Sequence, residues 1–385
     1  MPRQSRPGPT LTAGAPEQMS GTCSVVIAGG HSAGHIEPAM NVADAIRRTA
    51  PETVITALGT VRGLDTVLIP ARGYPLELIP PVPLPRKLNL ALLRTPGRVA
   101  DAVRAAGAVL DRVGADVVVG FGGYVAVPAY LAARKRKIPI VVHEANARPG
   151  VANRLAARLT EHVYTANSSV ALRHSRPIGI PLRPAITELD RAAGRPAARS
   201  KFGLDPDLTT LLVTGGSQGA QRINQAVLGA ERALADAGVQ VLHIPGPKNP
   251  VMAPAREPGQ PPYVVLPYLQ AMAEGYAAAD FVLCRSGAMT CAELTAVGLP
   301  AGYVPLPLRG GEQRLNAEPI VAEGGGLLVA DEACTPAWIE EQLLPVLADA
   351  NRLDAMARAA RRAGARDAAA VLAAAVLEVA RDHRR

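Results

Sequence analysis

Two glycine-rich turns, one in each half of the chain, follow short apolar runs and precede segments with helical spacing. The first is residues 29–35 (GGHSAGH), and the second is residues 215–220 (GGSQGA). A glycine turn that opens a helix offers bare backbone N–H groups and the positive end of the helix dipole, which suits a phosphate. Two such turns predict two nucleotide-binding-type domains that face each other, with a donor and an acceptor between them.

Short apolar runs alternate with helical segments along the whole chain. After the second turn, for example, Ile223, Val227 and Leu234 follow one helical pattern that ends at Gly238. The runs are rich in β-branched residues and lack polar alternation, which is typical of strands buried on both faces. We therefore predict an α/β fold with parallel sheets and right-handed βαβ units. The expected strands are residues 24–28, 54–58, 117–120, 138–143, 162–165, 210–214, 239–244, 263–266, 281–284, 301–304 and 327–329.

The length of 385 residues favours two domains. Residues 179–184 (GIPLRP) hold two prolines and a glycine and are the expected linker. We expect a first domain over residues 23–182, a second over residues 183–365, and a helix at about 366–385 that joins the first domain. Residues 1–22 lack the apolar segment of a signal peptide and are expected to form a disordered leader.

The formal net charge of +8 favours an anionic partner. No nucleic-acid module is recognisable, and three Phe and one Trp offer few stacking platforms, so nucleic acid is not expected. An anionic membrane surface or phosphate-bearing ligands fit better. No window approaches the roughly eighteen uninterrupted apolar residues of a spanning helix. We therefore expect an intracellular protein whose membrane contact is peripheral.

Two segments of the first domain mix basic residues with apolar ones or form a compact positive run. They are residues 81–90 (PVPLPRKLNL) and residues 134–137 (RKRK). Near an anionic surface each basic residue contributes about 1 kcal/mol, so both segments are candidate membrane contacts. For residues 134–137 the alternative is a solvated loop face. The candidates in the first segment are Leu84, Arg86, Lys87 and Leu88.

Cysteine spacing and acidic motifs give no sign of a metal site. The four cysteines form no CxxC pair and no zinc spacing with histidine, so buried free thiols in a reducing compartment are expected. No DxD-type aspartate pair follows a predicted strand. We expect neither a metal nor any other cofactor.

Three further segments follow predicted strands, where ligands of parallel sheets gather. Residues 120–124 (GFGGY) allow a close backbone approach, or make only a tight turn. Residues 143–146 (HEAN) resemble a site, although His143 and Glu144 could instead cap neighbouring loops. Residues 310–316 (GGEQRLN) offer amide and carboxylate groups to sugar hydroxyls.

The segment of residues 284–293 (CRSGAMTCAE) combines a strand end with a helix start near Ala288. Backbone N–H groups of residues 288–290 could hold a phosphate. Glu293, one turn further on, could accept both hydroxyls of a ribose. Its alternative is an acidic residue placed only to favour the helix dipole.

Taken in this order, the motifs resemble those of the MurG family, the UDP-N-acetylglucosamine transferases of glycosyltransferase family 28, in an actinobacterial form. The resemblance covers about residues 24–380. It implies the GT-B fold, in which two Rossmann-like domains face each other across an active-site cleft. The residues that carry it are 29–39 (GGHSAGHIEPA), 120–133 (GFGGYVAVPAYLAA), 143–154 (HEANARPGVANR), 215–224 (GGSQGAQRIN), 284–293 (CRSGAMTCAE) and 311–319 (GEQRLNAEP).

The resemblance implies an inverting transfer of N-acetylglucosamine from UDP to the 4-hydroxyl of N-acetylmuramoyl-pentapeptide on undecaprenyl diphosphate. This step makes lipid II from lipid I in peptidoglycan synthesis, on which cell shape and division depend. It would take place at the cytoplasmic face of the membrane, with other cell-wall synthesis proteins as candidate partners. The second domain would hold the donor and the first the lipid-linked acceptor.

Carried over by position, the resemblance implies a base and a donor site. His35 is the candidate base; its helix N-terminus should lower its pKa and keep it neutral, and Glu144 is the next candidate. Arg183 and Ser217 would lie near the diphosphate. The other candidates for donor contact are Asn146 and Gln313 at the sugar, Leu269 at the uracil, and Ser32, Ala33, Gly34, Gln218, Ala288, Met289, Thr290, Cys291, Ala292 and Glu293, while Tyr124 is expected on the acceptor side.

One position departs from the family pattern: His31 stands where glycine is usual, beside Ser32 in place of threonine. This departure leaves open a paralogue that serves a secondary-metabolite pathway with another acceptor or donor. A UDP-N-acetylglucosamine 2-epimerase shares the two-domain architecture, but the GGSQGA and HEAN segments argue against it. A non-catalytic nucleotide-sugar binder is the remaining alternative, and the presence of His35, Glu293 and Gln313 argues against it.

Overall fold

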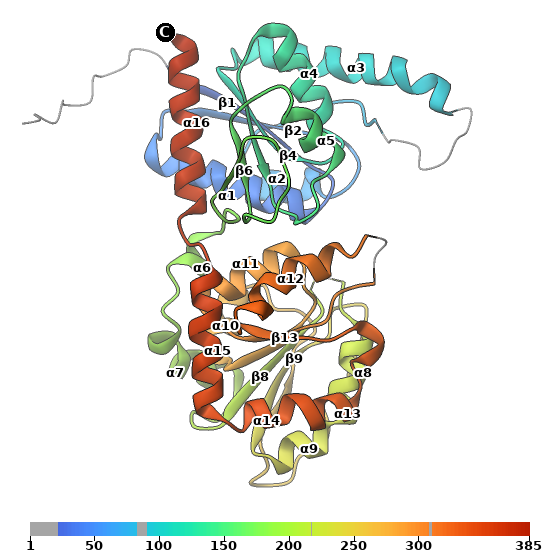
Figure 1. The fold of residues 1–385 in the computed structure, drawn as a ribbon, viewed down its shortest axis with the longest axis vertical. Coiled ribbons are helices and arrows are strands. Elements are labelled where there is room, and N and C mark those ends of the chain that lie inside the picture. The colour runs from blue at the N-terminus through green and yellow to red at the C-terminus, as the bar shows by residue number, and fades with distance from the viewer. Residues whose placement is uncertain (1–21, 83–90, 217, 308–309) are drawn as a thin grey trace, which may run out of the picture.

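The computed structural model describes residues 22–82, 91–216, 218–307 and 310–385. It contains two α/β units, one above the other in Figure 1, each built on a single parallel sheet. The predicted α/β class with parallel sheets is therefore confirmed. Within this described part, no helix is both long and apolar enough to cross a membrane.

The first sheet has seven strands in the order β3-β2-β1-β4-β5-β6-β7, all parallel. The order reverses between β1 and β4, which opens a crevice at their carboxyl ends. The first glycine-rich turn leaves β1 at that crevice. The strands are β1 (Ser24–Gly29), β2 (Val54–Gly59), β3 (Leu76–Leu78), β4 (Val117–Gly122), β5 (Ile140–Glu144), β6 (Val163–Thr165) and β7 (Ser175–Pro177).

The second sheet repeats this plan with six parallel strands in the order β10-β9-β8-β11-β12-β13. Its switch point lies between β8 and β11, and the second glycine-rich turn follows β8 there. The strands are β8 (Thr209–Thr214), β9 (Val239–Ile244), β10 (Tyr263–Val265), β11 (Phe281–Cys284), β12 (Ala301–Tyr303) and β13 (Gly326–Leu328).

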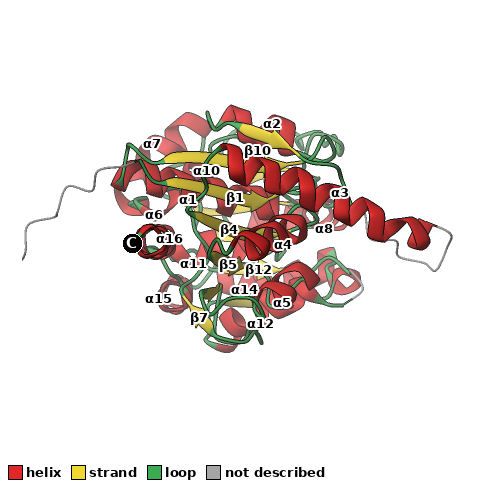
Figure 2. Ribbon diagram, turned by 90° about the horizontal axis from the view of Figure 1, so that it is seen from above, coloured by secondary structure: helices red, strands yellow, loops and turns green. Residues whose placement is uncertain are grey.

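Helices cover both faces of each sheet (Figures 1 and 2). The longer ones are α1 (Ala33–Thr49), α3 (Ala91–Arg112), α4 (Ala126–Arg136), α7 (Arg191–Phe202), α8 (Gln221–Gly229), α11 (Ala288–Val297), α12 (Glu312–Ala322), α15 (Ala350–Ala363) and α16 (Ala368–Arg384). The shorter ones are α2 (Asp65–Ala71), α5 (Val151–Ala156), α6 (Pro184–Thr187), α9 (Glu231–Asp236), α10 (Met272–Ala278), α13 (Pro336–Trp338), α14 (Leu344–Leu347), a 3-10 turn (Asp331–Ala333) and a π-helical turn (Ile339–Leu343).

The unalternating strands are buried on both faces, as their sequences predict. In β1, Val25 and Ile27 belong to the core beneath α1 and α16, while Val26 and Ala28 belong to the core beneath α3 and α4. Successive side chains of a strand point to opposite faces, so a continuous apolar run fills two cores at once.

The two strands at the edges of the first sheet, β3 and β7, do not appear among the expected strands. Each is three residues long, and their side chains are half-buried or exposed. Neither therefore needs the apolar run by which the central strands are recognised. Pro177 in β7 is compatible with an edge, where its missing N–H costs no ladder hydrogen bond.

The chain crosses between the units twice. Residues 178–183 lead from β7 into α6, and at the C-terminus the chain passes from α15 on the second unit to α16 on the first (Figure 1). Leu372 and Val376 of α16 are fully buried in one core with Ile36 and Met40 of α1. The last helix is thus part of the first unit.

Candidate active site

A cavity of about 570 Å³, called here the first cavity, lies at the carboxyl ends of β1, β4 and β5. Five of the predicted site residues line it: Ser32, His35, Tyr124, Glu144 and Asn146. Glu312 at the start of α12 also lines it, so the second unit closes one side of the first cavity.

His35 lies in the first turn of α1, with its Nδ1 2.9 Å from the hydroxyl oxygen of Ser32. The other edge of the ring faces Gly122, whose φ is +88°. A Cβ at Gly122 would lie 3.3 Å from Nε2 of His35. Glycine at position 122 leaves room for this nitrogen. The close backbone approach expected of residues 120–124 is thus made to the first glycine-rich turn of the protein.

The pKa of His35 is lowered from its usual value, as predicted. Burial is the largest cause, and the nearby His31 lowers the pKa further, while Glu144 and Asp65 raise it. The helix N-terminus, the cause expected from the sequence, is not among these causes. The imidazole is neutral at pH 7, the state that a general base needs.

Glu144 is 2 % exposed at the end of β5, and both of its oxygens are engaged. Oε1 accepts from the N–H of Asn146 at 2.9 Å; Oε2 accepts from the N–H of Gly150 at 2.9 Å and from Nδ2 of Asn153 at 3.0 Å. The carboxylate therefore holds the loop between β5 and α5. This geometry favours the loop-capping interpretation of Glu144 over a catalytic one.

His143 is fully buried and faces away from the first cavity. Its Nε2 lies 2.8 Å from the carbonyl oxygen of Gly179, in the connection between the units. Burial lowers the pKa of His143 to about 4. The neutral ring thus ties β5 to the interdomain connection, which is again the capping interpretation.

A second cavity, of about 410 Å³, opens at the carboxyl ends of β8, β9 and β11. Arg183, Leu269, Thr290 and Glu293, four of the predicted donor-site residues, line it. So does Glu37 of α1, so the first unit reaches into the second cavity just as Glu312 reaches into the first.

Glu293 lies in the second turn of α11, and its Oε2 accepts a hydrogen bond from the hydroxyl of Tyr276 at 2.8 Å. Burial raises the pKa of Glu293, and Tyr276 and Arg183 act in the opposite direction. A carboxylate held in this way on a cavity wall can accept hydroxyl groups of a bound sugar.

The side chains of residues 288–293 do not form one surface. α11 begins at Ala288, as predicted, and its N-terminus lies beside the second cavity. Only Thr290 and Glu293 line that cavity, because helical spacing directs their neighbours elsewhere. Ala288, Cys291 and Ala292 line a cavity of about 200 Å³ on another face, and Met289 packs against the second-unit core.

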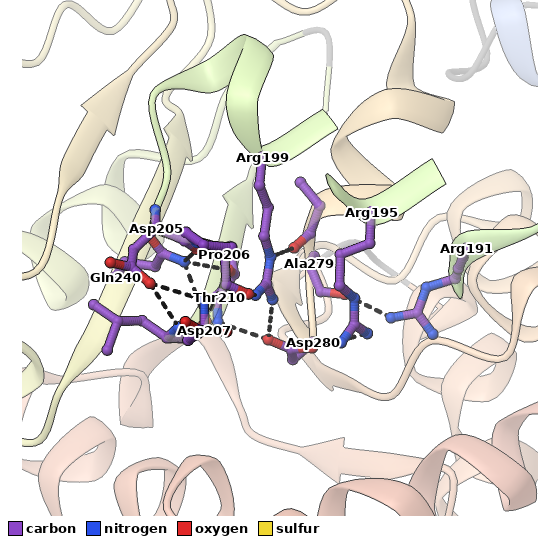
Figure 3. A network of polar contacts seen from close by, with 12 residues as sticks. Arg191, Arg195, Arg199, Asp205, Pro206, Asp207, Thr210, Gln240, Ala279 and Asp280 are labelled. Carbon is purple, nitrogen blue, oxygen red and sulfur yellow. Dashed lines mark hydrogen bonds and ion pairs between the residues drawn. The ribbon is translucent and has the colours of Figure 1, made fainter. Parts of the chain in front are cut away.

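Three arginines of α7, Arg191, Arg195 and Arg199, lie near Asp280, which pairs with Arg195 and Arg199 (Figure 3). Arg191 donates to the carbonyl oxygens of Tyr276 at 3.0 Å, Gly298 at 3.0 Å and Ala279. These carbonyls lie at the ends of α10 and α11. Arg191 thereby fixes the two helices that present Tyr276 and Glu293, and no feature of the sequence singles it out.

The remaining predicted residues are placed as follows. Gln313 Oε1 accepts from the N–H of Leu306 at 2.9 Å, and Gln218 Oε1 accepts from Lys248 at 3.2 Å. Ala33 and Gly34 lie in the first turn of α1 but line neither of the two main cavities. The predicted residues that lie outside the described part of the chain are Leu84, Arg86, Lys87, Leu88 and Ser217.

His31, the residue that departs from the family pattern, has a φ of +77°. This left-handed conformation favours glycine, the residue that the family resemblance implies at this position. Asp65, buried and missed by sequence reasoning, accepts the N–H of His31 and thereby holds the turn. The His31 ring packs edge-to-face with Tyr124, 5.9 Å between centroids, at the wall of the first cavity.

The described residues contain no group of three or more His, Cys, Asp or Glu side chains placed to hold a metal ion. Two arginines, Arg183 and Arg285, line the second cavity.

Two family models match the chain: the glycosyltransferase family 28 N-terminal domain over residues 25–165 and the C-terminal domain over residues 210–372. A curated relative from Thermobifida fusca is 59 % identical over 94 % of this chain and 95 % of its own length. One from Streptomyces coelicolor is 57 % identical over 92 % and 97 %. Both are named UDP-N-acetylglucosamine--N-acetylmuramyl-(pentapeptide) pyrophosphoryl-undecaprenol N-acetylglucosamine transferase.

Solved structures of similar fold include a member of the same family. MurG of Acinetobacter baumannii is 25 % identical, with a TM-score of 0.77 over 93 % of this chain and 100 % of that one. The UDP-GlcNAc 2-epimerase of Neisseria meningitidis, at 15 % identity and a TM-score of 0.62 over 92 % and 100 %, shows a shared fold alone. The chain belongs to the MurG family of glycosyltransferases, within glycosyltransferase family 28.

Proposed function

We propose that this chain is a hexosyltransferase that moves N-acetylglucosamine from UDP to the 4-hydroxyl of N-acetylmuramoyl-pentapeptide on undecaprenyl diphosphate. Relatives at 57–59 % identity, matched over nearly their whole length, carry this donor and this lipid-linked acceptor in their names. The observation on the molecule that supports it best is the neutral, half-buried His35 at the wall of the first cavity.

In this proposal the donor occupies the second cavity. Its ribose hydroxyls bond to Glu293, its uracil contacts the backbone at Leu269, and its diphosphate lies between Arg183 and the N-terminus of α11. The acceptor sugar enters the first cavity, beside His35 and Asn146. Both cavities are lined from both units, so the two substrates meet at the interdomain cleft.

The reaction is one in-line displacement. The acceptor 4-hydroxyl oxygen attacks the anomeric carbon, its proton passes to Nε2 of His35, and the bond from that carbon to the diphosphate breaks as UDP leaves. When the Ser32 hydroxyl accepts from Nδ1–H, the Nε2 lone pair is free to take the proton. Negative charge that develops on the diphosphate is balanced by Arg183 and the helix dipole, without a metal ion.

The direct test incubates the protein with labelled UDP-N-acetylglucosamine and a lipid I analogue, with and without EDTA. We expect a disaccharide-lipid product in both cases. Free UDP without this product would point to another acceptor, as in a paralogue of a secondary-metabolite pathway. An unaltered donor would point to a non-catalytic binder.

The His35→Ala variant should lose about 10²- to 10⁴-fold in kcat, the usual contribution of a general base. Its affinity for UDP-N-acetylglucosamine should stay unchanged, because His35 does not line the second cavity. His383→Ala, at an exposed position of α16, is the control and should behave as wild type. A His35→Ala variant with wild-type kcat would remove His35 from the base role.

We further propose that the protein acts peripherally at the cytoplasmic face of the membrane, through the first unit. Its acceptor is a lipid, so the first cavity must open toward a bilayer. Figure 2 shows the N-terminal end of α3 extending beyond the rest of the first unit. The last turn of α4 adds Arg134 and Lys135, both exposed, whereas Arg136 pairs with Asp111 at 2.6 Å.

A further inference from the structure

Glu37 and Arg183 form an ion pair at the wall of the second cavity, although Glu37 belongs to the first unit and Arg183 ends the connection that leads into the second. Glu37 lies in the first turns of α1, and Arg183 is the residue that precedes α6. Nη2 of Arg183 donates to Oε2 of Glu37 at 2.9 Å. The guanidinium thus has a carboxylate as its counter-ion.

Glu37 has a second cationic partner. Nη1 of Arg72 lies 3.1 Å from the same Oε2. Arg72 also donates to Oδ1 of Asn41 at 3.0 Å and pairs with Asp44. If Arg183 turned away, Glu37 would therefore keep its ion pair with Arg72. The large free-energy cost of leaving a half-buried carboxylate without a counter-ion would not arise.

Arg183 is only partly satisfied by this pair. Its Nε is buried and lacks a hydrogen-bond partner among the described residues, while its side chain is 41 % exposed at the cavity. Both members of the pair act on the nearby Glu293 carboxyl. Burial is the main cause of its raised pKa; Arg183 lowers this pKa, and Glu37 raises it. The pair therefore acts electrostatically on the interior of the second cavity.

We infer that Glu37 is a positioning residue that competes with the donor's diphosphate for Arg183. This inference rests on the proposed function, because it requires a nucleoside diphosphate in the second cavity. A diphosphate that enters is repelled by Glu37 and attracted by Arg183, so the guanidinium exchanges one anion for the other. After transfer, the return of Arg183 to Glu37 favours release of UDP.

The test measures equilibrium binding of UDP and of uridine, which lacks the phosphates, to wild type and to Glu37→Gln. We expect the variant to bind UDP about 2- to 5-fold more tightly, the scale of a partly exposed charge pair, and uridine with unchanged affinity. Under turnover, KM for the donor should fall in the same proportion. Glu77→Gln, which removes a carboxylate paired with Arg112 elsewhere on the first unit, is the matched control and should bind as wild type.

A double-mutant cycle shows whether the effect passes through Arg183. In an Arg183→Gln background, Glu37→Gln should tighten UDP binding much less than it does alone, because only the direct repulsion between Glu37 and the diphosphate then remains. Equal or weaker UDP binding by the single variant would overturn the inference, and so would undiminished tightening without Arg183. Glu37→Asp keeps the charge and should stay near wild type, which separates loss of charge from loss of fold. Failure of wild type to bind UDP at all would instead overturn the proposed function.

Discussion

At the scale of single residues, the candidate site combines groups that sequence motifs reveal with groups that only tertiary contacts reveal. His35 and Glu293 follow glycine turns after strands, so their positions could be predicted. Asp65, which holds the strained turn at His31, and Arg191, which donates to the carbonyl oxygen of Tyr276, belong to no motif. They act through contacts between residues 34 or more positions apart, which spacing along the chain does not encode.

Two fully buried imidazoles make the stability of the protein depend on pH. Burial lowers the pKa of His143 and of His243 to about 4, below the value near 6.5 expected in the unfolded chain. Between these values the unfolded state binds more protons, so stability is complete above about pH 6.5 and is lost as the pH falls. At pH 5 each imidazole should cost about 2 kcal/mol of unfolding free energy.

Urea unfolding at pH 7.5 and pH 5.0 checks this prediction. His243→Gln should show a shallower pH dependence than wild type, because it removes one of the two fully buried imidazoles. The pH dependence is the informative quantity, since the substitution also disturbs hydrogen bonds of His243 with Tyr263 and Asn224. The same pH dependence in variant and wild type would contradict the prediction.

At the scale of elements, apolar runs identify the central strands, and their limits agree with the structure to within two residues. The edge strands β3 and β7 are not predicted, because they are short and contain no such apolar run. The single helical pattern expected after the second turn is in fact two helices, α8 and α9, that break at Ala230. Gly229 packs there against Pro336, a contact that local periodicity cannot show.

The exposed basic residues in the last turn of α4 are the candidate membrane contact among the described elements. Arg134→Gln combined with Lys135→Gln should weaken co-sedimentation with anionic liposomes, because each basic residue near the surface contributes about 1 kcal/mol. Arg136 is kept, since it pairs with Asp111. Arg358→Gln combined with Arg362→Gln removes two exposed charges from α15 of the second unit and should leave sedimentation unchanged. Unchanged binding of the α4 variant would leave residues 134–137 as a solvated surface.

At the scale of the whole molecule, the repeated strand–turn–helix pattern predicts two similar sheets, and the switch points β1/β4 and β8/β11 explain why both cavities open where they do. The pattern does not predict that each unit contributes a carboxylate to the other's cavity. Glu37 and Glu312 reach these cavities because the two units face each other. The relative orientation of the units depends on the two chain crossings.

The second chain crossing, from α15 to α16, returns the chain to the first unit. α16 is the final element of the chain, yet it completes the core of the first unit against α1. Leu372→Ala should remove about 2–5 kcal/mol of stability, because Leu372 is fully buried there. Hydrogen exchange should then quicken in β1, α1 and α16 while the strands of the second sheet stay protected. Val371→Ala, at a neighbouring position that is 38 % exposed, is the matched control with little expected effect. Equal loss of protection in both sheets would mean that the two units unfold as one.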